Sequence, residues 1–289
     1  MKIAVFGATG KTGRYLVERL CADGHEVHAF GRNTEKLNRL DPRALRIVAD
    51  LENPPTLHGR LNAVDCVVSL AHARFTENLL TAIPQECPRI VLTGSTRKFT
   101  RLPDPAADAV RKGEAAFLAS GRPGVMLHPT MIYGAPDERN VNRILRLARG
   151  WPRFVPLILP LPDGGRNVLQ PIFVDDMVEA LAAATSQVRA FGPPIIVAGP
   201  EPITYADMVR ACACAMGRKA RVVGVPVKWL AAIARLAARW GIRLPFDAAE
   251  FARAGEDKRF DISDMQTRLG VNPRPFADGL RLKVERGWM

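Results

Sequence analysis

The stretch "GATGKTGRYL" (residues 7–16) follows an apolar run at residues 3–6, near the start of the chain. Its glycines stand at positions 7, 10 and 13, a spacing typical of the turn that holds the pyrophosphate of a dinucleotide. The stretch also resembles a nucleoside-triphosphate P-loop, because Lys11 and Thr12 follow Gly10. That pattern requires another glycine five positions before Gly10, where Val5 stands in the apolar run. We therefore predict a strand, a dinucleotide-binding turn and a helix whose first N–H groups face the phosphates, with a chance strand-to-helix turn as the alternative.

The second apolar run ends at Phe30 and is followed by Gly31 and Arg32. Dinucleotide-binding folds that prefer NAD place an acidic residue here for the ribose 2′-hydroxyl, whereas an arginine suits a 2′-phosphate. We therefore expect NADP(H) in preference to NAD(H), with Lys11 and Arg14 as candidate helpers. The alternative is that Arg32 is only a solvated loop charge. The cofactor contacts expected in the glycine turn are Gly7, Ala8, Thr9, Gly10, Lys11, Thr12 and Gly13.

Apolar runs of strand length alternate with segments of helical periodicity along the first two thirds of the chain. Such alternation predicts an α/β fold with a doubly wound, Rossmann-like parallel sheet. The expected strands are 2–6, 26–30, 46–49, 65–70, 89–93, 124–128 and 194–199. We expect residues 1–135 to form the core, with 166–200 returning to it, and residues 136–165 and 201–289 to form a smaller C-terminal lobe. In this lobe we expect a helix at about 138–149 and a capping box formed by Thr204 and Asp207.

Composition narrows the classes of partner. The 289 residues include 41 Lys plus Arg against 29 Asp plus Glu, and the net charge of +12 favours anionic partners. Five cysteines without a C-x-x-C pair predict a reduced, cytoplasmic protein. No apolar stretch reaches roughly 18 residues without a charge or proline, so we expect neither a signal peptide nor a membrane span. We also expect no metal site.

Seven segments together resemble the extended or atypical short-chain dehydrogenase/reductase superfamily, in particular its NAD(P)-dependent epimerase/dehydratase-like and NmrA-like branches. They are GATGKTG (7–13), FGRNTEKL (30–37), VADL (48–51), VDCVVSLAH (64–72), RIVLTGST (89–96), VMLHPTMIYG (125–134) and PIFVDDMVEAL (171–181). The resemblance implies a Rossmann domain with a C-terminal substrate lobe. It also implies that Asp50 and Leu51 lie near the adenine and that Leu70 and Ala71 lie beside the cofactor ribose. The run His128, Pro129 and Thr130 would pass the nicotinamide.

The proton-transfer pair of this superfamily, Tyr-x-x-x-Lys on one helix, is absent from the sequence. The three tyrosines are followed four positions later by Arg19, Asp137 and Val209. Alignment on Glu114 puts Ala106 in the tyrosine position and Val110 in the lysine position. Lys112 lies about 200° around the helix from that position, so only a shift of register would allow it to replace the lysine.

Three residues are the candidates for catalysis: Ser95, Thr96 and His128. Ser95 and Thr96 follow an expected strand at the sheet edge where ligands gather in such folds, and a hydroxyl there can orient a carbonyl. His128 takes the place of an arginine that commonly precedes the family's proline, and we expect it to titrate near neutrality. The alternative is a half-buried strand histidine that is bonded to the backbone.

Two functional hypotheses remain open. The first is an NADP(H)-dependent oxidoreductase or epimerase-like enzyme that acts on a small carbonyl, alkene or quinone. The second is a non-catalytic NADP(H)-binding redox sensor or assembly protein, which would use basic stripes to contact a protein or an anionic membrane. The stripes are Arg139, Arg143, Arg146, Arg149 and Arg153, then Lys228, Arg235 and Arg239; the alternative is a solvated basic face. Nucleic-acid binding is disfavoured because only 7% of the residues are aromatic, and the oligomeric state is open.

Overall fold

The chain divides into two compact units in the computed structural model, which describes residues 1–152, 154–226, 229 and 256–288. The first unit comprises residues 1–132, 174–198 and 261–273, and the second comprises 133–173, 199–260 and 274–289. These bounds differ from the expected ones at residues 133–135, 166–173 and 199–200, which lie in the second unit, and at residues 261–273, which lie in the first. The last segment contains helix α10 (Ser263–Leu269), whose buried Met265 and Leu269 face helix α6 and strand β11.

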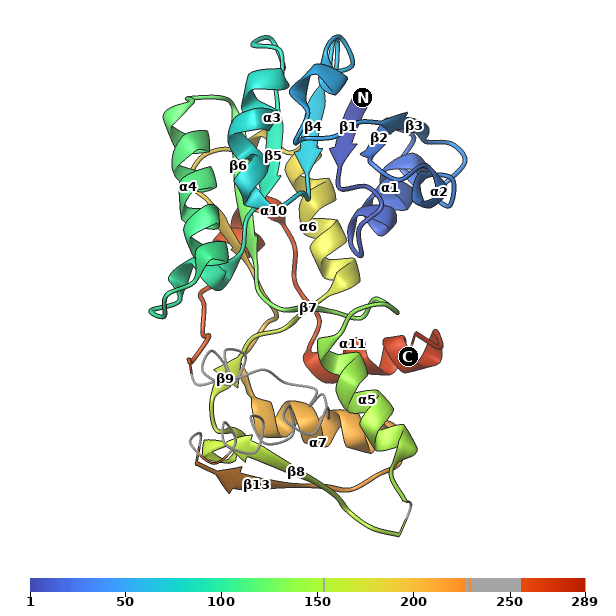
Figure 1. Cartoon of the computed structure of the whole chain (residues 1–289), viewed down its shortest axis with the longest axis vertical. Coiled ribbons are helices and arrows are strands. Elements are labelled where there is room, and N and C mark those ends of the chain that lie inside the picture. Colours follow the sequence, from blue (N-terminus) through green and yellow to red (C-terminus); the bar gives the residue numbers. More distant parts are fainter. Residues whose placement is uncertain (153, 227–228, 230–255, 289) are drawn as a thin grey trace. The chain divides into compact units, whose positions relative to one another are not determined.

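The first unit is built on a seven-stranded sheet in the order β11-β6-β5-β4-β1-β2-β3. Figure 1 labels the strands from β6 to β3 in this order. All strand pairs of this sheet are parallel, as the sequence predicts for a doubly wound, Rossmann-like fold. The strands are β1 (Lys2–Phe6), β2 (Glu26–Gly31), β3 (Leu45–Val48), β4 (Cys66–Ser69), β5 (Ile90–Thr93), β6 (Gly124–Pro129) and β11 (Ile195–Val197). Six of them occur within one residue of the expected bounds, and β11 is shorter at both ends than the expected 194–199 because it pairs only with β6.

The helices of the first unit pack in pairs: α1 contacts α6, and α3 contacts α4. Helix α1 buries Leu16, Val17 and Leu20 and ends before Gly24, whose φ of +79° reverses the chain. The helices are α1 (Gly13–Ala22), α2 (Thr34–Leu37), α3 (Thr76–Ala82), α4 (Pro105–Ala119) and α6 (Val174–Ser186), with short 3-10 helices η1 (Pro54–Leu57), η2 (Ala73–Phe75), η3 (Thr96–Phe99) and η5 (Val188–Ala190). The parallel sheet is thereby buried between helices, which explains its almost continuous apolar strands.

The second unit contains three helices and short strand pairs among its described residues. Helix α5 (Asn140–Gly150) packs against α7 (Tyr205–Ala215), and α7 also contacts α11 (Phe276–Glu285). Strand β8 (Leu157–Pro162) pairs in parallel with β13 (Ala220–Val225), and β9 (Val168–Leu169) pairs antiparallel with β12 (Ile203–Thr204). The remaining short elements are β7 (Ile132–Tyr133), β10 (Ile172–Phe173) and η4 (Asp163–Gly165). The expected cap of α7 is present, because the Asp207 N–H donates to the Thr204 hydroxyl at 2.9 Å.

A buried lysine lies in the core of the second unit. Lys283, on α11, is fully buried, and its Nζ donates to the carbonyl oxygens of Gly134 and Ala135 at 3.0 Å each. Its Nζ also lies 4.0 Å from a carboxylate oxygen of Glu138. The Glu138 carboxylate in turn accepts the backbone N–H groups of Val141 and Asn142 at the start of α5, at 3.1 and 2.7 Å. These contacts join α11 to α5 through a charged group that is sealed from water.

Candidate functional site

The glycine loop between β1 and α1 is packed too tightly for side chains. Gly7 has a φ of +72°, and a Cβ placed there would lie 3.0 Å from the carbonyl carbon of Leu70. A Cβ at Gly13 would collide with the carbonyl oxygen of Gly7, and the Gly10 N–H donates to that same oxygen at 2.9 Å. The Thr12 side chain makes no cap at the start of α1. The loop therefore leaves bare backbone in front of a helix N-terminus, which is the arrangement that a pyrophosphate requires.

Arg32 is brought to the same edge of the sheet as the glycine loop. Phe6 and Phe30 are partners in the β1–β2 register, and their rings stack at a centroid distance of 4.5 Å. A Cβ placed at Gly31 would lie 3.3 Å from the side chain of Thr9, so the residue before Arg32 touches the glycine loop. Arg32 and Lys11 are both exposed, whereas the Arg14 guanidinium lies over the Tyr15 ring at 4.9 Å. Arg32 and Lys11 are therefore the accessible cations for a phosphate group here, and Arg14 is directed to its neighbour.

The expected adenine and ribose residues follow β3 and β4 at this edge. The Ala49 N–H donates to the Gly31 carbonyl at 3.1 Å, which sets Asp50 and Leu51 just beyond the β2–β3 ladder. One Asp50 carboxylate oxygen accepts the Glu52 N–H at 3.0 Å, and Leu51 is buried. The Leu70 N–H donates to the Phe6 carbonyl at 2.9 Å, so Leu70 and Ala71 lie beside the glycine loop. The sheet thus gathers residues that are distant in sequence along one edge.

The two candidate hydroxyl residues have different surroundings. Ser95 is half-buried, and its Oγ accepts the Arg97 N–H at 3.1 Å, which leaves its own proton free to be donated. The Thr96 hydroxyl is buried and donates to the Pro129 carbonyl at 3.1 Å. The Thr130 N–H donates to Val197 at 3.0 Å and joins this run to β11. Ser95 is the better hydrogen-bond donor to a bound molecule, because the Thr96 hydroxyl already donates its proton to the Pro129 carbonyl.

His128 belongs to a buried charged cluster that comprises Lys98, Glu114 and His128. The ring is 1% exposed, its Nδ1 accepts the Ser95 N–H at 3.0 Å, and its Nε2 lies 2.9 Å from a Glu114 carboxylate oxygen. Lys98 Nζ, from η3, donates to both oxygens of that carboxylate. Because Nδ1 is an acceptor, the proton of the neutral ring is on Nε2, the nitrogen that lies near Glu114.

The expectation that His128 titrates near neutrality is wrong. Burial is the main cause that lowers the pKa of His128 to about 4, and the charge of Lys98 lowers it further. Glu114 acts in the opposite direction and does not overcome the burial. The ring is therefore neutral at pH 7 and holds the Ser95 backbone in place, as the alternative of a backbone-bonded histidine requires.

Lys98 is the member of this cluster that the sequence does not reveal. It lies 16 residues before Glu114, on a different element, and no motif or helical spacing connects the two. Glu114 is recognisable only as the anchor of the helix on which Ala106 and Val110 stand. Ala106 and Val110 are in the first half of α4, and Val110 is buried. Tertiary packing thus supplies a cation near a helix face that lacks a lysine of its own.

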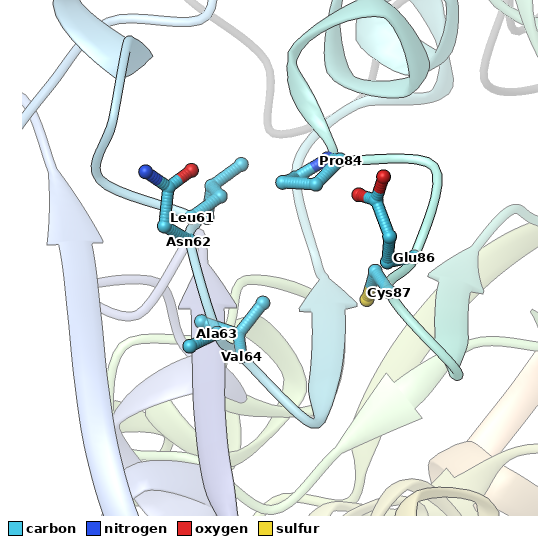
Figure 2. Close-up of a pocket in the computed structure, with 7 residues that line it drawn as sticks. All are labelled: Leu61, Asn62, Ala63, Val64, Pro84, Glu86 and Cys87. Atoms are coloured by element: carbon cyan, nitrogen blue, oxygen red, sulfur yellow. The ribbon is translucent and has the colours of Figure 1, made fainter.

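A separate cavity of about 290 Å³ lies at the end of the strands opposite to the glycine loop (Figure 2). Its lining residues precede β4 and β5, whereas the glycine loop follows β1. They include Leu61, Asn62, Glu86 and Cys87, and burial raises the pKa of the Cys87 thiol. None of the cofactor-binding or catalytic residues expected from the sequence lines this cavity, so it is distinct from the candidate cofactor site.

The first basic stripe lies along α5, where Arg139 precedes the helix and Arg143, Arg146 and Arg149 are within it. Arg153, Lys228, Arg235 and Arg239 fall outside the described residues. Within the described part of the chain we find no group of His, Cys, Asp and Glu that could hold a metal ion. The same residues contain no helix with the length and hydropathy that a membrane span requires.

Residues 7–118 match a family model described as NAD(P)H-binding. The matched range includes the glycine loop, Arg32 and the hydroxyl residues that follow β5. The first part of the chain is therefore similar to an NAD(P)H-binding domain. The glycine loop agrees with this similarity, because it would not accept a Cβ at Gly7 or Gly13 without strain or collision.

Curated proteins with similar sequences have diverse descriptions. An uncharacterized protein of Mycobacterium tuberculosis is 26% identical over 307 residues, covering 98% of this chain and 32% of that protein. The chain thus spans about a third of the length of the first curated relatives it matches. A 3-diazoavenalumate denitrifying reductase of Streptomyces sp is 28% identical over 229 residues, covering 64% of this chain and 72% of the reductase. NADH dehydrogenase [ubiquinone] 1 alpha subcomplex subunit 9 of Arabidopsis thaliana is 24% identical over 208 residues, covering 62% of this chain and 49% of the subunit.

Solved structures share the fold over the whole chain. The UDP-glucose 4-epimerase of Thermotoga maritima has a TM-score of 0.72 at 17% identity, covering 99% of this chain and 98% of the epimerase. The UDP-glucose 4-epimerase of Thermus thermophilus, in complex with NAD, has a TM-score of 0.70 at 19% identity, with 99% and 98% coverage. At these identities the likeness shows that the chain shares the fold of these epimerases.

Proposed function

We propose that this protein binds NADP(H) and is an oxidoreductase or epimerase-like enzyme that acts on a small carbonyl, conjugated alkene or quinone. The observation that carries the cofactor preference is Arg32, an exposed cation that follows β2 beside the glycine loop. Its guanidinium suits a 2′-phosphate, whereas the ribose 2′-hydroxyl of NAD is normally bonded by an acidic residue at this position. The similarity to a Streptomyces reductase supports the oxidoreductase part of the proposal.

Bound NADPH would supply a hydride to the substrate. The protein's part is to hold the pyrophosphate with the backbone of residues 7–13, the 2′-phosphate with Arg32 and Lys11, and the adenosine between Asp50, Leu51, Leu70 and Ala71. The Ser95 hydroxyl would donate a hydrogen bond to the substrate oxygen, while neutral His128 fixes the Ser95 backbone. Water would supply the proton to a reduced alkene or quinone, which lessens the need for a tyrosine.

A second candidate function is a non-catalytic NADP(H)-binding sensor or assembly protein. The observation that favours it is the absence of a tyrosine and a lysine at Ala106 and Val110 on α4. The similarity to an Arabidopsis subunit of NADH dehydrogenase also favours this candidate, because that relative is described as part of an assembly. The two candidates share the cofactor and differ only in turnover.

The cofactor claim is tested by titration with NADPH and with NADH. In the Arg32→Asp variant we expect NADPH to bind about tenfold more weakly or worse, while NADH affinity changes little, because only NADPH offers a 2′-phosphate. Arg60→Asp is the matched control, since it makes the same charge change at an exposed arginine of the first unit. Equal affinities of the Arg32→Asp variant and the wild type for NADPH would leave Arg32 as a solvated charge and overturn the NADP preference.

Turnover separates the two candidates. We expect the wild type to oxidise NADPH with at least one member of a panel of carbonyls, conjugated alkenes and quinones, and Ser95→Ala to lower kcat for that substrate. Tight NADPH binding without turnover of any panel member would contradict the enzyme and support the second candidate. A change in partner binding or oligomer size on addition of NADPH would then be its direct measurement.

We retain the cytoplasm as the proposed location. Cys21, Cys66, Cys87 and Cys212 are free and buried, and Cys214 is free and exposed. Free thiols of this kind are typical of reducing compartments.

A further inference from the structure

Two segments of the second unit contain no acidic residue. Residues 139–162 include five arginines, and residues 208–225 include three arginines and a lysine, without a single Asp or Glu in either segment. Helix α5 packs against α7, and β8 pairs with β13, so the two segments lie together in the structure. The positive charge of the chain is thus concentrated on one part of this unit.

The loop that joins α5 to β8 exposes apolar side chains beside these cations. Phe154 is 98% exposed, and Val155 is 47% exposed. The loop itself is held by the Trp151 indole N–H, which donates to the Pro156 carbonyl at 3.2 Å. Ile158, the second residue of β8, is 50% exposed. A phenylalanine with almost its whole surface in water costs the folded protein the free energy that burial of an aromatic ring would provide.

Basic residues that follow α7, in the turn before β13, lie against the same loop. The Arg218 guanidinium donates to the Trp151 carbonyl at 3.3 Å, and the Leu157 N–H donates to the Lys219 carbonyl at 2.8 Å. Lys219 is exposed, and Arg149 is exposed in the last turn of α5. Exposed apolar side chains are therefore flanked by cations from α5 and from the turn after α7, and neither segment contains a carboxylate.

We propose that this basic-apolar tip, formed by Arg146, Arg149, Phe154, Val155, Arg218 and Lys219, docks on an anionic lipid membrane. Phe154 and Val155 would enter the boundary between headgroups and acyl chains, and the cations would contact lipid phosphates and carboxylates. An anionic bilayer matches both the charge and the apolar loop, whereas a duplex nucleic acid would match only the charge. The docking is peripheral, and it is independent of the proposed NADP(H) function.

Co-sedimentation with vesicles tests the proposal. We expect the full chain to bind vesicles of phosphatidylcholine with phosphatidylserine in low salt, to bind pure phosphatidylcholine vesicles at least about tenfold more weakly, and to be released as salt rises. No binding to the phosphatidylserine vesicles in low salt would overturn the proposal. Binding to duplex DNA in the same buffer without binding to the vesicles would also overturn it, in favour of a nucleic acid.

Variants at the tip separate insertion from general charge. Phe154→Ala is expected to weaken vesicle binding by about tenfold, and Arg149→Glu by a similar factor. Leu45→Ala and Arg60→Glu are the matched controls in the first unit, because Leu45 is 54% exposed and Arg60 is exposed. Thermal melting curves and NADPH titration verify that each variant is folded. Vesicle affinities of Phe154→Ala and Arg149→Glu equal to those of their controls would contradict the proposed tip.

Discussion

Each unit places a lysine beside a glutamate, and the comparison separates a lysine that is partly open to water from one that is sealed in a core. Lys98, in the first unit, is 17% exposed, and its partner Glu114 is 15% exposed. Lys283, in the second unit, is 0% exposed, and Glu138 is 6% exposed. Lys98 stands three residues after Ser95, next to the sheet edge where ligands gather, whereas Lys283 is enclosed by backbone carbonyls.

The titration behaviour of the two groups follows from this difference. Burial lowers the pKa of Lys283 to about 8 and also raises the pKa of the Glu138 carboxyl, so desolvation acts against both charges of the pair. In the cluster of Lys98, Glu114 and His128, the group with the large shift is the neutral His128, whose pKa is lowered to about 4. In the second unit the desolvated groups are the two charged members of the Lys283–Glu138 pair. In the first unit the most buried member of the cluster, His128, is uncharged.

The largest expected effect is that of Lys283→Met. The change leaves the Glu138 carboxyl buried without its cation, so we expect the free energy of unfolding to fall by about 3–5 kcal/mol in chemical denaturation. Arg281→Met on the same helix is the control, because Arg281 is 67% exposed and should matter by less than about 0.5 kcal/mol. The double variant Lys283→Met/Glu138→Gln should regain part of the loss. Equal stabilities of the Lys283→Met and Arg281→Met proteins would refute the sealed-core assignment.

A smaller loss is expected for Lys98→Met. Its partner Glu114 keeps partial access to water, so we expect a decrease of about 1–3 kcal/mol. The same variant should raise the pKa of His128, because a cation that lowers it is removed while the Glu114 carboxylate remains. An NMR titration of the histidine rings measures this shift, with the exposed Lys112→Met on α4 as the control. An unchanged His128 pKa in Lys98→Met would show that the cluster does not act as one electrostatic unit.

The last expected effect is a slope in the dependence of stability on pH. The folded pKa of His128 is about 4, below the ordinary value of 6.5, so the unfolded chain binds more protons in the interval between them. The contribution of His128 to the free energy of unfolding should be fully present above pH 6.5. It should decline as the pH falls toward 4, by at most about 1.4 kcal/mol per pH unit. His128→Gln should flatten the slope, and His58→Gln, at an exposed position, should not. A slope that is identical in wild type and His128→Gln would contradict the shifted pKa.

The glycine loop and the strands of the first unit could be predicted because their signals are local. Gly13 is required by the close approach of the loop's own backbone and Gly7 by its positive φ, and the apolar runs mark buried parallel strands wherever they occur. The sequence does not predict that residues 261–273 return to the first unit. A short amphipathic helix can pack on any apolar surface, so its pattern does not specify which one it contacts. The Lys98–Glu114 pair was missed for a related reason, since opposite charges 16 residues apart are common in any sequence.

The sequence by itself determined the strand, glycine turn and helix of the cofactor loop, the arginine after the second strand and the absence of Tyr-x-x-x-Lys. These are properties of residue identity and spacing, and they hold in any fold that contains them. Only the tertiary structure decided that His128 is neutral, that Ser95 keeps a proton to donate while Thr96 does not, and that Lys98 neutralises Glu114. Those properties depend on desolvation and on contacts between distant elements, because a pKa and a hydrogen bond belong to an environment rather than to a residue.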